Sequence, residues 1–303
     1  MLINRRKFIK NTALAGGVMA FPDVEENSLG FKISQDFRLD ILATNWGFQG
    51  SMDQFCKKAK DEGYDGIEVW APREEKDKDI LMEAVAKYGL KVGFLAGNWG
   101  DGFKNNLNIF QEYVELATSY QPVFINCHSG KDFFTFDQNR QFIDFTTKIS
   151  KSTGVPIFHE THRARILFAA HIAREYIEKI PELRLTLDIS HWTCVAGSLL
   201  EDQQETVQKA LERTDHIHSR VGLVNGPQIP DPRAPEFSKE VAAHFKWWDK
   251  VVEIKSEKGE HLTMTTEFGP PSYMWALPYT KQPVANLWEV NAHMMRLWRE
   301  RYT

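Results

Sequence analysis

The sequence predicts an α/β fold: a single-domain (β/α)8 TIM barrel over residues 36–303, preceded by an N-terminal leader over residues 1–30. Short apolar runs rich in strand-forming residues alternate with amphipathic helical patterns, and the runs number eight. Their starts recur at intervals of roughly 25–35 residues, the length of one strand-plus-helix unit. One repeating architecture therefore explains the chain better than two separate domains do.

Each predicted strand is a nearly continuous apolar run, as expected for parallel strands whose outer face is covered by helices. A doubly wound open sheet is the competing fold. It requires a glycine-rich phosphate-binding turn after its first strand, and the segment ATNWGFQG does not provide one. The predicted strands span residues 39–46, 64–70, 91–97, 122–130, 155–162, 183–191, 215–222 and 261–269.

The segments between the strands show helical spacing. An apolar stripe that ends before Gly63 predicts a helix after the first strand, and it consists of Met52, Phe55, Cys56 and Ala59. The Gly- and Pro-rich stretch 223–235 interrupts the pattern after the seventh strand. Long loops at the C-terminal face of a barrel commonly contact substrate, so we expect this loop to lie near the active site.

Composition excludes several classes of function. The net charge is −4, so no basic field is present to bind a nucleic-acid backbone. The three cysteines are scattered and lack CxxC spacing, which argues against a disulfide framework and against a cysteine-based zinc site. We interpret Cys56, Cys127 and Cys194 as buried thiols.

The first residues resemble an export signal. Residues 1–11 are basic, residues 12–21 are small and apolar, and Ala20 ends a possible cleavage site. The string NRRKFIK resembles a twin-arginine motif, which predicts a periplasmic protein; the alternative is a basic tail on a cytoplasmic protein. The apolar run is shorter than the roughly 20 residues that cross a bilayer, so we expect no membrane span.

Polar residues mark the ends of the last four predicted strands, where barrel enzymes place their active sites. Neighbouring strands lie about 4.8 Å apart, so four side chains at one level can converge. Three carboxylates and one imidazole suit Mn²⁺, Mg²⁺, Co²⁺ or Zn²⁺, and without a cation the carboxylates would repel one another. The alternative is that each residue forms a salt bridge at the barrel rim. The predicted ligands are Glu160, Asp188, His218 and Glu267.

Five motifs resemble the xylose-isomerase-like sugar isomerases and epimerases, a family that includes the ketose 3-epimerases. They are YDGIEVW, HETH, LDISHW, DHIHSRVG and TEFGP, and together they extend over essentially the whole barrel. The resemblance implies the same metal ligands, Glu160, Asp188, His218 and Glu267. It further implies that His191 contacts substrate and places Arg220 near the family's substrate-binding arginine.

The resemblance also implies an activity: a divalent-metal-dependent isomerase or epimerase that acts through an enediolate on a sugar or keto-sugar. Glu160 and Glu267 would be catalytic, one removing a proton and the other returning it. The alternatives are a metal-dependent lyase, dehydratase or hydrolase on a keto-sugar or glycoside, and a non-catalytic sugar-binding protein. The expected partner is a small carbohydrate, and a homo-oligomer is compatible with the sequence.

Other residues at the same face are further candidates for substrate binding. His128 and His162 end the fourth and fifth strands, where each would contact substrate or be a buried imidazole. Trp46 and Trp99 end the first and third strands and would stack on the C–H face of a sugar, or pack in the core. Glu68, in the second strand, would hydrogen-bond substrate or pair with a neighbouring base.

Overall fold

The structure, a computed structural model, describes residues 30–97 and 99–303. Residues 33–303 form one compact unit. Residues 1–29 of the predicted leader lie outside the described residues, so export of the protein stays a prediction.

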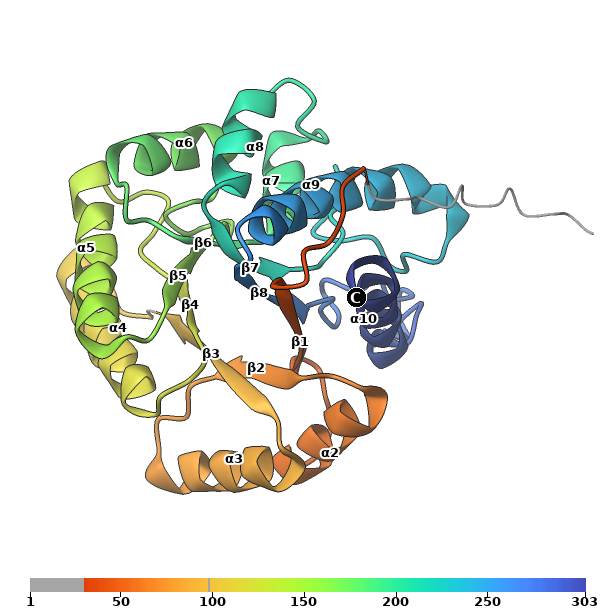
Figure 1. The fold of residues 1–303 in the computed structure, drawn as a ribbon, viewed down its shortest axis with the longest axis horizontal. Helices are drawn as coiled ribbons and strands as arrows, with labels where there is room; N and C mark the ends of the chain where they lie inside the picture. The colour runs from red at the N-terminus through yellow and green to blue at the C-terminus, as the bar shows by residue number, and fades with distance from the viewer. Residues whose placement is uncertain (1–29, 98) are drawn as a thin grey trace, which may run out of the picture. The chain divides into compact units, whose positions relative to one another are not determined.

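Eight strands close into a barrel in which each strand pairs in parallel with its neighbours in the sequence and β8 pairs with β1 (Figure 1). The predicted TIM barrel is thereby confirmed. Most strands are shorter than the apolar runs that predicted them, because the runs continue into buried loops. The strands are β1 (Arg38–Thr44), β2 (Gly66–Trp70), β3 (Lys91–Gly97), β4 (Ile125–His128), β5 (Ile157–Glu160), β6 (Leu185–Leu187), β7 (Thr214–His218) and β8 (His261–Thr266).

Helices surround the barrel in Figure 1. The predicted strand over 183–191 is wrong at its end, because Ile189 begins α7. A continuous apolar run cannot by itself distinguish a buried strand from the first turn of a buried helix. The helices are α2 (Met52–Glu62), α3 (Glu75–Tyr88), α4 (Gly102–Ser119), α5 (Phe136–Thr153), α6 (Ala170–Lys179), α7 (Ile189–Ala196), α8 (Gln204–Leu211), the 3-10 turn η1 (Pro235–Phe237), α9 (Ser238–Glu257) and α10 (Leu287–Tyr302).

Local sequence signals explain where the helices begin and end. The Ser51 side chain caps the first turn of α2, and Gln54 reaches back to the Ser51 backbone, which satisfies two amide groups that a helix start leaves unpaired. Thr135 and Gln138 repeat this capping box on α5. Gly63 ends α2 with φ 104°, a left-handed conformation that glycine adopts without steric cost.

The structure bears on the expected absence of a membrane span and on the expected burial of the cysteines. Within 30–97 and 99–303, no helix combines the length and the apolar character that crossing a bilayer requires. The cysteines are free thiols, and Cys56 and Cys127 are buried. Cys194, on α7, is partly exposed, so the expectation of a third buried thiol is wrong.

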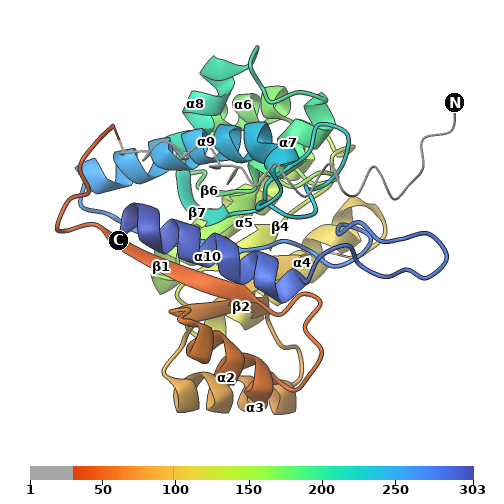
Figure 2. The same cartoon turned by 90° about the vertical axis from the view of Figure 1, so that its right-hand side faces the viewer.

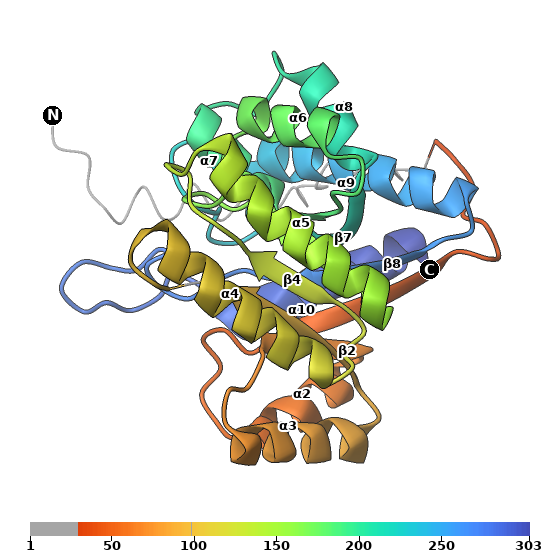
Figure 3. The ribbon, with the colours of Figure 1, turned by 90° about the vertical axis from the view of Figure 1, so that its left-hand side faces the viewer.

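Aromatic packing fills the barrel interior below the strand ends. The Phe124 ring stacks on Phe158 with centroids 5.9 Å apart and lies 4.2 Å from the His216 ring. Figures 2 and 3 show β1 and β4 pointing to the side from which the loop between β8 and α10 projects. Polar side chains at the strand ends therefore lie next to this apolar layer and face these loops.

Gly93 leaves space for the Phe124 ring of this apolar layer. Gly93→Ala should therefore destabilise the barrel by about 1–3 kcal/mol through overpacking. A Cβ at position 93 would lie 2.4 Å from the Phe124 ring. Urea denaturation of the variant and the parent measures the loss. Combining the change with Phe124→Leu should cost less than the sum of the two single changes, whereas additive losses would contradict the contact.

Candidate metal centre

The four predicted ligands lie together at the C-terminal ends of β5 to β8. Glu160 is the last residue of β5, and His218 is the last residue of β7. Asp188 caps the N-terminus of α7 directly after β6, and Glu267 directly follows β8. One ligand atom from each of the four lies within 4.8 Å of the others, and all four residues are buried.

This donor set fits a divalent cation. Buried polar atoms are nearly always hydrogen-bonded, yet Glu160 Oε1 has no hydrogen-bond partner among the described residues. His218 Nδ1 meets Glu267 Oε2 at 2.9 Å as an ion pair without hydrogen-bond geometry. Three carboxylates and one imidazole that converge in a buried site match the oxygen-rich coordination of Mn²⁺, Mg²⁺, Co²⁺ or Zn²⁺.

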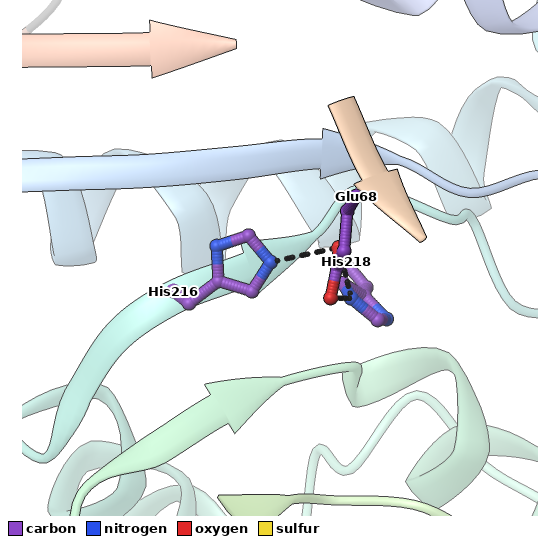
Figure 4. Close-up of side chains that lie close together, drawn as sticks. All are labelled: Glu68, His216 and His218. Carbon is purple, nitrogen blue, oxygen red and sulfur yellow. Dashed lines mark hydrogen bonds and ion pairs between the residues drawn. The ribbon is translucent and has the colours of Figure 1, made fainter. Parts of the chain in front are cut away.

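Glu68 orients the His218 imidazole, as Figure 4 shows. Its two carboxylate oxygens lie 3.0 and 3.2 Å from His218 Nε2, and one of them lies 3.2 Å from His216 Nε2. A proton on His218 Nε2 then points at Glu68 and leaves Nδ1 toward the other ligands, as in the carboxylate–histidine–metal arrangement of many metal sites. Of the two sequence interpretations of Glu68, pairing with a neighbouring base is therefore the one that the structure displays.

The sequence analysis did not include Asn126 among its candidates, yet this residue links the two sides of the site. Its side-chain amide, on β4, donates to Glu160 Oε2 at 2.7 Å and to Glu68 Oε1 at 3.3 Å. Its position two residues before His128 on the same strand was the available signal, because alternate residues of a strand share a face. Asn126 thus fixes a predicted ligand and its neighbour.

The carboxylates of the centre favour the binding of a positive charge. Burial alone would lower the pKa of His218, but the charges of Glu267, Glu68 and Glu160 outweigh it and raise that pKa well above its usual value. Burial raises the pKa of Asp188 to about 6, although Arg220 opposes the shift. Burial also works against ionised Glu160, but His128 and His218 keep its pKa well below the usual range.

These shifts predict that metal binding releases about one proton per chain at pH 7. The raised pKa of His218 means that the metal-free imidazole is protonated at neutral pH, and a ligand imidazole must be neutral. Affinity should therefore rise with pH and fall more steeply below about pH 6, where Asp188 also takes a proton. Titration calorimetry in buffers of different ionisation enthalpy counts the protons; a pH-independent affinity between pH 6 and 8 would contradict the prediction.

Arg220, two residues after the end of β7, lies next to the four predicted ligands. Its Nη2 lies 2.8 Å from His191 Nε2 and 3.6 Å from Glu267 Oε2, and it also pairs with Asp188. Its Nε donates to Ser190 Oγ at 3.0 Å. The guanidinium is buried and lies over the Tyr273 ring, 4.9 Å from its centroid. Arg220 therefore balances part of the negative charge and presents one edge to the space above.

Three histidine rings form a row beside the ligands. His128 Nε2 lies 2.8 Å from Glu160 Oε2. The ring centroids of His128 and His162 are 4.6 Å apart, and those of His162 and His191 are 4.0 Å apart. Burial lowers the pKa of His162 to about 3 and that of His191 well below its usual value, with further lowering by neighbouring positive groups. Neutral imidazoles can donate and accept hydrogen bonds without adding charge.

A pocket of about 440 Å³ opens above these groups. Of the predicted residues, Glu267 lines it, as do the substrate-binding candidates Trp46, His128, His162 and Arg220. Glu68, His191 and Trp99 are absent from its lining: Glu68 and His191 are buried, and Trp99 packs against the Trp70 ring instead.

Sequence reasoning missed two aromatic residues of the pocket. Trp70 ends β2 as Trp46 follows β1, so the strand-end criterion would have found it. Tyr273 lies in the loop after β8, where no periodic pattern marks it. The Trp46 and Tyr273 rings meet edge to face with centroids 4.9 Å apart. Both rings line the pocket, as Trp70 does.

The sequence and the fold were compared with those of known proteins. A family model described as a xylose isomerase-like TIM barrel matches residues 56–220. No curated protein matches the sequence. Solved structures with the same fold include a D-allulose 3-epimerase from Methylomonas sp., at 12% identity and a TM-score of 0.57 over 87% of this chain and 98% of that one.

Two further structures are similar to the same extent. The IOLI protein, described with a binding zinc atom, has 15% identity and a TM-score of 0.58, with 87% of this chain and 99% of that chain covered. The 3-keto-D-glucoside 4-epimerase YcjR from E. coli has 12% identity and a TM-score of 0.55, with 87% and 100% covered. At such identities the likeness supports the fold, and function has to be argued from the site.

Proposed function

The chain belongs to the xylose isomerase-like TIM barrel family, and from this premise we propose that it is a divalent-metal-dependent isomerase or epimerase of sugars or keto-sugars. The observation that carries the proposal is the convergence of Glu160, Asp188, His218 and Glu267 on one point below a pocket with aromatic sides. Two structural neighbours named as sugar epimerases and one named with zinc support it.

The proposed reaction is a proton transfer next to a carbonyl. A divalent ion held by the four ligands would act as a Lewis acid that polarises a sugar carbonyl and acidifies the neighbouring C–H. Glu267 lines the pocket and is the carboxylate that accepts the proton from that carbon. Glu160, on β5 rather than β8, would carry a proton taken from solvent and donate it to the opposite face of that carbon, after which Glu267 releases its own proton to solvent.

The remaining residues bind and orient the substrate. Arg220 and the neutral His162 present hydrogen-bond donors to sugar hydroxyls, and His128 holds Glu160 in place. The Trp46 ring offers an apolar face to the C–H side of a sugar. A lyase, dehydratase or hydrolase on the same site is the second candidate, because the same proton removal can expel a substituent from the next carbon.

Incubation of the metal-loaded protein with ketohexoses in deuterium oxide tests this proposal. We expect deuterium to enter a carbon next to the carbonyl while the carbon skeleton and the formula of the sugar are retained, as mass spectrometry and NMR can show. Loss of water or of an aglycone would refute the isomerase and support the lyase or hydrolase. Binding of sugars without any exchange or conversion would leave a non-catalytic sugar-binding protein.

A further inference from the structure

Two exposed tryptophans extend the pocket outward. Trp70 ends β2 and lines the pocket, yet the residue is 40% exposed. Trp99 follows β3 and is 53% exposed, and its ring lies 5.1 Å from the Trp70 ring. We call Trp70 and Trp99 together the tryptophan ledge. Neighbouring indoles that stay exposed beside a binding pocket indicate a surface that contacts a ligand.

The ledge is continuous with the metal centre. The Trp70 ring meets the His128 ring edge to face, with centroids 5.2 Å apart. His128 in turn lies 2.8 Å from Glu160. An unbroken row of contacts therefore leads from the proposed proton donor to a surface outside the pocket.

The surrounding residues hold the ledge in place. A Cβ at Gly97 would lie 3.3 Å from the Trp70 ring and from His128 Cβ, so the glycine leaves room for the close approach of that ring. The Arg73 guanidinium lies 4.9 Å from the Trp99 ring and 4.5 Å from the Tyr113 ring. The Tyr113 hydroxyl donates to the Ala71 carbonyl at 2.6 Å and ties this group to the loop after β2.

The base of the pocket is rich in carboxylates. Among the described residues that line it, Arg220 is the only lysine or arginine, and it already pairs with Asp188. Glu68, Glu160 and Glu267 add further negative charge at the base. A phosphate or carboxylate group at this base would lie beside these carboxylates, with Arg220 as the one lysine or arginine side chain of the described lining to meet it.

We propose that the substrate is a neutral glycoside: a sugar bound at the metal centre carries a second uncharged sugar ring that stacks on the tryptophan ledge. This inference rests on the proposed function. The first ring lies in the pocket that Trp46 and Trp70 line, and the second ring places its C–H face on Trp99. An indole offers a large, rigid apolar surface to such a face at little cost in side-chain entropy.

Matched substrates test the proposal on the full-length, Mn²⁺-loaded protein. The panel is D-fructose, D-fructose 6-phosphate and four neutral disaccharides in which glucose is attached to fructose at O3, O4, O5 or O6. Steady-state kinetics of deuterium exchange gives kcat and KM for each sugar. We expect at least one disaccharide to have a KM about tenfold lower than that of fructose.

Two variants identify the surface responsible. Trp99→Ala should raise the KM of the favoured disaccharide more than that of fructose, so that the ratio of the fructose KM to the disaccharide KM falls toward one. Trp275→Ala is the matched control, because Trp275 is a similarly exposed indole that packs on Phe237 rather than on the ledge. It should leave the ratio as it is. An unchanged ratio in Trp99→Ala, or a preference for free fructose or its phosphate, would overturn the proposal.

The failure of this inference is distinguishable from that of the proposed function. Exchange into fructose with no gain from a second ring would keep the isomerase and reject the ledge as a subsite. If no sugar exchanges deuterium, the isomerase is rejected, and calorimetric binding of the same panel decides the inference. Disaccharides that bind more tightly than fructose, and lose that advantage in Trp99→Ala, would still support it; equal binding would reject it.

Discussion

Replacing Glu267 with glutamine lowers the rate of deuterium exchange into the substrate by about 100- to 10,000-fold, the range that a general base contributes. Glutamine has nearly the same shape and keeps one oxygen that can bind a cation, but it cannot accept a proton from carbon. Glu267 lines the pocket, and so its loss acts on the reacting carbon directly. Glu160→Gln should have a comparable effect, because Glu160 supplies the returning proton.

Metal content has to be measured alongside activity, because both residues are also proposed ligands. The expected result is a deficit that persists when exchange is expressed per bound metal ion and at saturating metal. Glu236→Gln is a suitable control, since Glu236 is an exposed carboxylate in η1. Exchange within a few-fold of the parent in Glu267→Gln and in Glu160→Gln would remove both residues from the catalytic role.

Replacing Glu68 with glutamine should weaken metal binding by about 10- to 100-fold, the usual effect of losing a carboxylate that orients a ligand histidine. Glutamine can accept one hydrogen bond from His218 Nε2 but carries no charge. The His218 imidazole would then be a weaker donor and would be less firmly held between Glu68 and the other ligands. Glu68 does not line the pocket, so the change acts through His218 and not on the substrate.

Competition titration with a chromophoric chelator measures the affinity of the Glu68→Gln protein for Mn²⁺ or Zn²⁺. Glu62→Gln provides a matched loss of one carboxylate, because Glu62 pairs with Arg296 outside the site. The melting temperature in the presence of a chelator reports whether the metal-free fold is intact. Unchanged metal affinity in a folded Glu68→Gln protein would contradict the positioning role.

The recurring apolar runs predicted the barrel, and the strand ends predicted that Glu160, Asp188, His218 and Glu267 lie together. This was possible because parallel strands in a closed barrel bring their C-terminal ends to one face, so position along the chain determines which side chains meet. Asp188 and Glu267 lie just beyond their strands rather than within them, but a difference of one residue does not move them off that face.

Contacts across the barrel were beyond such reasoning. Glu68 on β2 pairs with His216 and His218 on β7, and nothing in the spacing of either strand specifies that pairing. The packing of Trp99 on Trp70 could not be predicted either, because it depends on the orientation of both side chains. Loop residues such as Tyr273 also escape prediction, because their position follows from tertiary packing and not from a periodic pattern.

X-ray absorption spectroscopy of the metal-loaded protein, with metal content determined on the same sample, tests the central claim most directly. The account predicts one divalent ion per chain, bound by one imidazole nitrogen and otherwise by oxygens, with no sulfur ligand, and loss of that ion in Asp188→Asn. An ion bound by thiolate or by several imidazoles, or a metal content that Asp188→Asn does not change, would contradict it.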